Sequence, residues 1–116
     1  MLCKHFKGTN LLEKNIYRIE ELGVKGSDIN DEEVAYYGKK DLKTTNNLVV
    51  YSNIFQEGKK FCREYEDLAE ELSSDEQIIY GQKHRVEPLN EEEIAYISES
   101  RFIKEKEEYV RTKFPK

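Results

Sequence analysis

Residues 48–55 read Leu-Val-Val-Tyr-Ser-Asn-Ile-Phe, and residues 60–65 read Lys-Phe-Cys-Arg-Glu-Tyr. β-Branched and aromatic side chains dominate the first run, and such side chains favour a strand. In the second run, Phe61 and Tyr65 fall on one face of a strand because successive side chains alternate between faces. Gly58 stands in the turn between the runs, at a position that must tolerate a positive φ. The sequence therefore predicts a β-hairpin over residues 48–65, with its first strand at the centre of a sheet.

Shorter strand patterns flank this hairpin on both sides. Residues 15–24 alternate apolar and polar side chains before the glycines at positions 23 and 26, which predicts a strand with a bend. Residues 34–37 (Val-Ala-Tyr-Tyr) predict a short second strand that completes a hairpin arm with it. Residues 83–87 predict another strand that Pro88 stops, whereas residues 77–80 fit either a helical turn or a strand.

Two helices are predicted after the hairpin. Apolar residues at three- and four-residue steps indicate a short helix over residues 65–72 that caps an open end of the sheet. Asn90 and Glu93 have the spacing of a capping box, which predicts a helix from Glu91 to about Lys113. Its apolar stripe consists of Ala95, Tyr96, Phe102, Ile103, Tyr109 and Val110. A helix of this length exceeds what so small a domain covers, so we expect the excess stripe to pack on a second copy and form a homo-oligomer.

These patterns predict a single α+β domain over residues 1–116, because a chain of 116 residues is too short for two separate cores. Its β-rich core, residues 3–88, is expected to form a small, twisted, mostly antiparallel sheet or a partly open barrel. One short helix and a long C-terminal helix within residues 90–113 complete the predicted fold.

Charge and hydropathy exclude several classes of partner. The net charge is −5, from 24 acidic and 19 basic side chains, so no general attraction to nucleic acid or to anionic lipid is expected. The sequence has no apolar run near the ~18 residues of a membrane span and does not begin like a secretory signal. We therefore expect a cytoplasmic protein of a bacterial host cell, with no nucleic-acid or membrane partner and with both cysteines as thiols.

Catalytic and metal-binding patterns are weak. Cys3, His5, Cys62 and His84 have the right atoms for zinc, but their spacing lacks the close pairs of structural zinc sites. No glycine-rich loop for phosphate is present, and no local signature marks Cys62 as a nucleophile. The sequence therefore predicts no metal, no cofactor and no enzymatic activity. Catalysis by Cys62 stays as a further alternative that thiol alkylation tests.

A cationic and aromatic group is the main candidate for a binding site. Arg63 and Arg85 suit anionic groups, because a guanidinium pairs bidentately with phosphate or carboxylate. The remaining candidate residues are Tyr51, Phe61 and Tyr65 for stacking, together with His5 and Lys7. In an alternative interpretation, the two arginines only pair with the nearby acids Glu64, Glu66 and Glu87 at a sheet edge. Both interpretations remain open from the sequence.

Five short motifs in order resemble a small family of unknown function found in bacteria and phages. Its members read roughly H-F-K-G, Y-R-V, L-V-V-Y, W-V-R-P-L-E-M-F and K-Y-R-F-E. The matching segments here are 4–8, 17–18, 48–51, 61–68 and 82–87, so the resemblance covers about residues 3–88. The segment 23–47 is longer than in the family, Phe61 replaces the Trp, and Glu64 replaces the Pro. The resemblance implies a compact β-rich fold and no mechanism.

The likeness to phage-borne members suggests a setting for the binding site. Small acidic phage proteins include counter-defence proteins, and some, such as the Thoeris anti-defence proteins, sequester cyclic nucleotide or ADP-ribose signals without cleaving them. By analogy, the sequence predicts a non-enzymatic phage protein that sequesters a nucleotide-type signalling molecule. The alternative is an acidic protein-interaction module that inhibits or adapts a bacterial partner protein.

Overall fold

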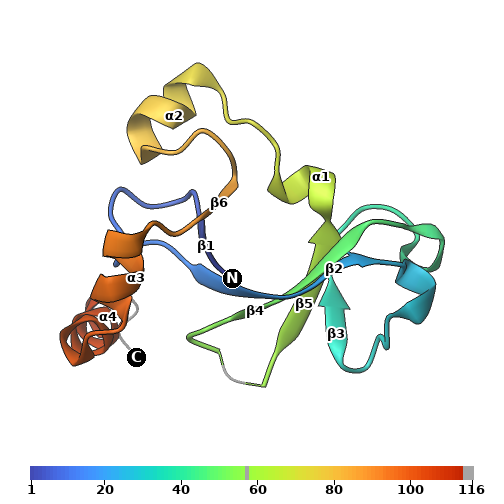
Figure 1. The fold of residues 1–116 in the computed structure, drawn as a ribbon, viewed down its shortest axis with the longest axis horizontal. Coiled ribbons are helices and arrows are strands. Elements are labelled where there is room, and N and C mark those ends of the chain that lie inside the picture. Colours follow the sequence, from blue (N-terminus) through green and yellow to red (C-terminus); the bar gives the residue numbers. More distant parts are fainter. Residues whose placement is uncertain (57, 114–116) are drawn as a thin grey trace.

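The computed structural model describes residues 1–56 and 58–113 and has an α+β fold built on one open sheet (Figure 1). Six strands form this sheet in the order β3-β5-β4-β2-β1-β6. Their bounds are β1 Leu2–His5, β2 Ile16–Val24, β3 Val34–Tyr36, β4 Leu48–Asn53, β5 Lys60–Glu64 and β6 Val86–Pro88. The predicted mostly antiparallel sheet is confirmed, and of the two predicted forms it is the open sheet, with β3 and β6 at its edges.

The hairpin of β4 and β5 is confirmed, and β4 lies inside the sheet between β5 and β2. Tyr51 pairs with Phe61 and Val50 with Cys62. Gly58 has a φ of 79°, as the turn requires, whereas Glu57 of the predicted turn lies outside the described residues. The first strand ends at Asn53 and not at residue 55, because the Asn53 side chain accepts a hydrogen bond from the Phe55 amide and closes a turn.

The predicted bend in β2 is confirmed, but the predicted pairing of β3 is wrong. β2 has two register shifts against β4, between Ile19 and Glu21 and between Glu21 and Val24, and such irregularities bend a strand. β3 pairs in parallel with β5 and forms no hairpin arm with β2. The 3₁₀ turns η1 (Gly26–Asp28) and η2 (Leu42–Thr44) flank β3 along the chain and pack on each other. We call residues 25–47, which include η1, β3 and η2, the excursion. It carries the chain to the edge of β5 that faces away from β4.

The predicted helix over residues 65–72 is only one turn long, α1 (Tyr65–Leu68). The chain then leaves the helix because residues 70–72 pair with residues 83–85. The Arg85 amide donates to the Glu70 carbonyl at 2.9 Å, and the Leu72 amide donates to the Lys83 carbonyl at 2.8 Å. Between these two segments lies α2 (Ser74–Tyr80), which resolves the open assignment of residues 77–80 as helix. The predicted strand at 83–87 is β6, shifted to Val86–Pro88.

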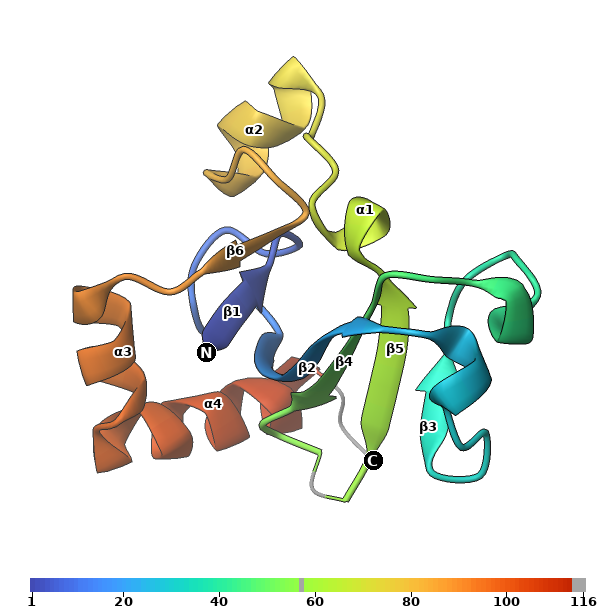
Figure 2. The same cartoon turned by 45° about the vertical axis from the view of Figure 1, so that its right-hand side comes forward.

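The C-terminal region forms two helices, α3 (Glu91–Ile97) and α4 (Ser100–Lys113), and not the single predicted one. The capping box of Asn90 and Glu93 is confirmed, and the long C-terminal helix is confirmed from Ser100 onward. Between the helices the chain turns sharply (Figure 2). This turn carries Phe102 into a buried cluster with Ile16, Leu89 and Ile97. Part of the apolar stripe is thus used inside the molecule, which removes the length argument for a homo-oligomer.

The two faces of the sheet are covered differently. We call the face that bears Tyr17, Ile19, Val49, Tyr51 and Phe61 the aromatic face; Leu68 of α1 packs against it. On the opposite face, α3 and α4 cover the end near β1 and β2, and the excursion between β2 and β4 covers the end near β4 and β5. The candidate site lies along the aromatic face.

Candidate functional site

A row of five aromatic rings crosses the aromatic face, one from each successive strand or its end. We call it the aromatic row: His5, Tyr17, Tyr51, Phe61 and Tyr37. Its neighbouring ring centroids are 6.0, 4.7, 5.9 and 5.5 Å apart in that order. Direct and diagonal cross-strand neighbours on one sheet face lie within reach of aromatic side chains, which explains the alignment. The row joins His5, Tyr51 and Phe61 of the predicted site.

The rings of the row differ in exposure. Tyr51 is only 5% exposed, so it supports the row from the core, and burial raises the pKa of its hydroxyl. Tyr17 and Phe61 are half-buried, and Tyr37 is largely exposed. Phe61 and Tyr37 stack at an interplanar angle of 28°. A flat ligand therefore has ring surface to contact at the Phe61 end of the row, while Tyr51 does not act as the predicted stacking surface.

Arg63 lies on the same face as the row, two residues after Phe61. One guanidinium nitrogen, Nη2, is 3.9 Å from Asp67, a residue of α1. Its Nε is buried and has no hydrogen-bond partner among the described residues. Glu64, which the sequence offered as a partner, instead accepts a hydrogen bond from the Tyr36 hydroxyl. A buried N–H without a partner is rare in folded proteins and marks a place where a water, ion or ligand is expected.

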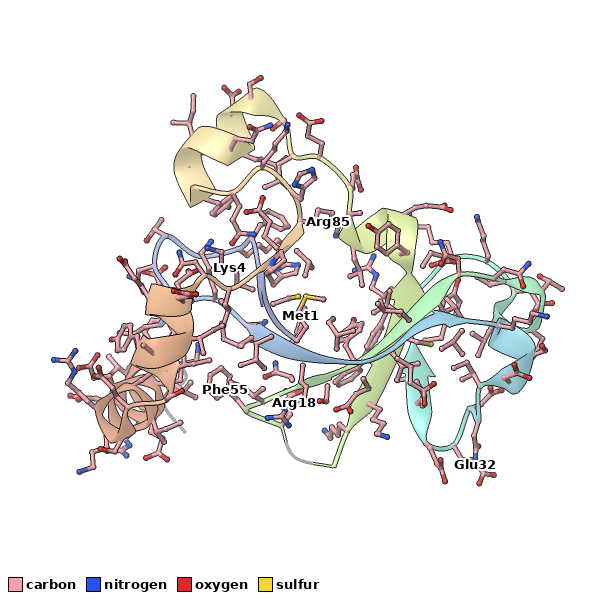
Figure 3. All side chains as sticks on the ribbon, viewed as in Figure 1. Met1, Lys4, Arg18, Glu32, Phe55 and Arg85 are labelled. Carbon is pink, nitrogen blue, oxygen red and sulfur yellow. The ribbon has the colours of Figure 1, made fainter. Side chains whose placement is uncertain are left out.

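Arg85 reaches the same region from the segment before β6. Its Nη1 is 3.3 Å from Glu70, and its guanidinium carbon is 6.0 Å from the centroid of the Phe6 ring. Glu87, another partner offered by the sequence, accepts from the backbone amides of Lys83 and His84 instead. Figure 3 shows Arg85 on one side of the β2–β4 ribbon and Arg18, a basic residue outside the predicted site, on the other.

Arg63 and Arg85 line one hollow with a volume of about 350 Å³, which we call the arginine hollow. Tyr37 at the end of the aromatic row lines it as well. Its charged lining consists of the bases Lys39, Lys40, Arg63 and Arg85 and the acids Glu64, Glu66, Asp67 and Glu70. The two predicted arginines are thus brought together, although each of them has an acidic neighbour from α1 or the residues after it.

The other end of the row lies in a positive electrostatic field. Burial and, in decreasing order, the charges of Arg85, Lys7, Arg63 and Lys14 together lower the pKa of His5 to about 4. The imidazole is therefore neutral at pH 7. Arg63 and Arg85 also oppose the effect of burial on Tyr17, whose pKa is raised overall. A chain with a net charge of −5 thus concentrates cations beside its aromatic face.

Two predicted residues, Tyr65 and Lys7, belong neither to the aromatic row nor to the lining of the arginine hollow. Tyr65 begins α1, is half exposed and takes part in none of the ring contacts among the described residues. Lys7 is exposed and lines a neighbouring hollow of about 740 Å³, which it shares with Arg85 and Glu70. Arg85 therefore stands between the two hollows.

The sequence does not predict Tyr37, Lys39 or Lys40 as site residues. Tyr17 is close to the cationic group in the sequence pattern, because it alternates with Ile19 on a predicted strand that neighbours the hairpin, but no role in the site is predicted for it. Tyr37 and the two lysines show no such pattern, since the parallel pairing of β3 with β5 brings them to the hollow.

The thiols and imidazoles do not gather into a metal site. Cys3 and Cys62 are buried, and burial raises the pKa of both thiols. Within residues 1–56 and 58–113, no group of three or more His, Cys, Asp or Glu side chains has an arrangement that could hold a metal ion. In the same part of the chain, no helix has the length and apolar character needed to cross a membrane.

Comparison of the chain with protein-family models, with curated proteins and with solved structures finds no match. The resemblance to the phage and bacterial family therefore stays a prediction.

Proposed function

We propose that this protein binds a small anionic ligand of nucleotide type in the arginine hollow and holds it without chemical change. One observation carries the proposal: Arg63 and Arg85 line the same hollow, and the buried Nε of Arg63 has no hydrogen-bond partner among the described residues. A phosphate in the hollow can pair with the outer guanidinium nitrogens, and a turn of the guanidinium that exposes the Nε would let its N–H donate to the same group.

The acids beside the arginines are weak competitors for them. Asp67 is 3.9 Å from Arg63, and the side chains of Asp67 and Glu70 are 42% and 60% exposed. Ion pairs of such exposed groups contribute only ~0–1 kcal/mol. A hydrogen bond to a charged group contributes ~1.5–3 kcal/mol when it forms in a sheltered place. A ligand phosphate is therefore expected to displace Asp67 and Glu70 with a net gain.

The aromatic row supplies the second half of the site. Phe61 and Tyr37 present stacked rings next to the hollow, and Tyr37 lines it. Stacking of one base on an aromatic side chain contributes ~1–3 kcal/mol and tolerates different bases. A ligand with both a phosphate and a flat ring uses both parts, which favours a nucleotide over a simple anion.

The groups around the hollow suit capture better than reaction. Arginine side chains stay protonated throughout the physiological range, and the buried Cys62 thiol has a raised pKa. This chemistry agrees with the proposed role of a phage counter-defence protein that sequesters a signalling molecule in its host.

Isothermal titration against cyclic dinucleotides, cyclic mononucleotides and ADP-ribose tests the proposal. Arg63→Ala is expected to weaken binding of the recognised compound by about 1.5–3 kcal/mol. Arg18→Ala is the matched control, because Arg18 lies on the opposite face and lines a different hollow. Absence of heat with every compound, from protein whose circular dichroism shows an intact fold, would remove the proposal.

A second function, an acidic protein-interaction module, is favoured by a separate observation. Residues 66–76 contain the acids Glu66, Asp67, Glu70, Glu71, Asp75 and Glu76 and no base. This segment leads into α2, the element that projects from the body in Figures 1 and 2. A partner recognised there would associate faster at low ionic strength and more slowly as salt is added.

A further inference from the structure

The helix α2 has one face held by the protein and one face that is free. On the held face, the Tyr80 ring contacts Phe6 at a centroid distance of 5.2 Å, and the Gln77 side chain donates to the Leu72 carbonyl at 2.9 Å. The Lys14 ammonium donates to the Tyr80 carbonyl at 3.1 Å and to the Gln82 side chain at 2.8 Å. The helix is therefore fixed to the body although it projects from it.

The free face bears two isoleucines in water. Ile78 is 82% exposed and Ile79 is 57% exposed, the former being the most exposed of the large apolar side chains in the described part of the chain. Asp75 lies one turn before them, and residues three and four apart share one side of a helix. The free face therefore bears Asp75, Ile78 and Ile79, and Glu71 precedes the helix in the sequence.

Local stability does not explain these isoleucines. Isoleucine forms helices less readily than alanine, leucine, lysine or glutamate, so the sequence of α2 gains nothing locally from a β-branched pair in water. The capping box of Ser73 and Glu76 and the left-handed Gly81 already define both ends of the helix. The apolar surface of Ile78 and Ile79 contributes favourable free energy only when another molecule covers it.

We propose that the free face of α2 docks a basic amphipathic segment of a partner protein. The partner's apolar side chains would cover Ile78 and Ile79, and its lysines or arginines would face Asp75 and Glu71, since Asp67 and Glu70 already lie beside Arg63 and Arg85. Charge complementarity selects this occupant: the segment from 66 to 76 has six acids and no base. The inference rests on the second function proposed above, and its docking residues Glu71, Asp75, Ile78 and Ile79 are separate from the lining of the arginine hollow.

A synthetic probe tests the docking face without knowledge of the partner. The probe is a fluorescein-labelled amphipathic peptide of leucine and lysine, and fluorescence anisotropy measures its Kd for the full chain. The double variant Ile78→Ala, Ile79→Ala removes the apolar surface and raises helix propensity, so loss of α2 cannot account for weaker binding. We expect its Kd to rise by roughly tenfold or more, since two apolar contacts are lost.

Matched controls separate the face from nonspecific attraction. Ile94→Ala and Ile103→Ala change isoleucines of similar exposure to Ile79 on α3 and α4, and both should keep the wild-type Kd. Asp75→Asn with Glu71→Gln should weaken binding and flatten its dependence on salt.

The other possible results contradict the α2 docking face, the acidic module or the identity of the partner. If the acid variant weakens binding but the isoleucine double variant does not, the acidic module stands and the α2 face is wrong. Failure of the wild type to bind the probe at low salt overturns both. A monomer-to-oligomer shift that the isoleucine variant abolishes, seen by light scattering without peptide, would show that a second copy is the occupant and contradict the proposal.

Discussion

His5 lies at one end of the aromatic row, and its pKa depends on the positively charged side chains around it. Its pKa is about 4 in the folded protein and 6.5 in the unfolded chain. Between these values the unfolded chain binds more protons, so the contribution of His5 to stability is present above pH 6.5 and is lost as the pH falls toward 4. The same cations that lower this pKa are the ones that would attract an anionic ligand.

We therefore predict that the free energy of unfolding falls from pH 7 to pH 4.5 and that His5→Gln reduces this fall. Urea unfolding at a series of pH values measures it, with His84→Gln as the control because His84 lies beside Glu87 and is not part of the aromatic row. An unchanged pH profile in the His5 variant would show that the cations do not act on this side chain.

Lys14 is a buried cation with a structural role that the sequence did not reveal. Its ammonium donates to the Phe6 carbonyl at 2.9 Å, to the Tyr80 carbonyl at 3.1 Å and to the Gln82 side chain at 2.8 Å. Burial lowers its pKa. The Lys14 carbonyl in turn accepts from the buried Lys106 of α4 at 3.1 Å. The two lysines tie α2 and α4 to the loop after β1.

We predict that Lys14→Met lowers the free energy of unfolding by about 2–4 kcal/mol, because two buried acceptors and one partly buried acceptor lose their donor. Lys104→Met on the exposed side of α4 should stay within about 0.5 kcal/mol of the wild type. Denaturant unfolding monitored by circular dichroism gives both values. Equal stability of the two variants would mean that the Lys14 bonds contribute nothing.

Among the elements, α3 and α4 show where a sequence pattern misleads. Ala95 and Tyr96 before residues 98–100 and Phe102 and Ile103 after them are seven residues apart in pairs. This spacing fits one continuous helix, so the sequence predicts one. The break is set by packing at a distance: Phe102 is fully buried and its ring meets Tyr96 edge-on at 5.0 Å. The Ser98 hydroxyl donates to the Ile94 carbonyl and stabilises the end of α3.

We predict that Phe102→Ala costs about 3–5 kcal/mol of unfolding free energy, the range for deletion of a buried phenyl ring. The neighbouring Ile103 is half exposed, so Ile103→Ala should cost less than about 1 kcal/mol. Chemical denaturation of both variants checks the difference. A result in which both changes cost the same would place the α3–α4 turn outside the core.

How far the sequence predicts each element depends on whether its causes are local. The hairpin of β4 and β5 and the capping box at Asn90 follow from neighbouring residues, and both are confirmed. The parallel pairing of β3 with β5 depends on the path of residues 25–47. One contact in that path is very close: a Cβ on Gly26 would meet the Leu42 carbonyl oxygen at 1.6 Å. No local sequence pattern predicts this close contact between Gly26 and Leu42.

In the candidate site, too, the sequence predicts the residues placed by local structure and misses those placed by the tertiary fold. Phe61, Arg63 and Tyr51 were predicted because they belong to the hairpin, and His5 joins them through strand alternation. Tyr65 was predicted to share a strand face with Phe61, but the strand ends at Glu64 and Tyr65 begins α1 instead. Tyr37 and the lysines after it reach the arginine hollow only through the tertiary fold.

On the scale of the whole molecule, charge is divided between two regions. Cations gather beside the aromatic face, and acids gather along residues 66–76 and lead to α2. Asp67 and Glu70 lie where these two regions meet, each next to one of the arginines. A ligand that displaces them would therefore also change the charge presented near α2. The acidic net charge alone does not exclude an anion-binding site.

In the proposed complex, the Nε–H of Arg63 donates to an anionic ligand in the arginine hollow. Arginine-selective ¹H–¹⁵N NMR follows this group directly during titration with the nucleotide that titration calorimetry identifies. We expect saturable shifts of the Nε–H signals of Arg63 and Arg85, with no change at Arg18. Saturation of the protein with both of those signals unmoved would contradict it.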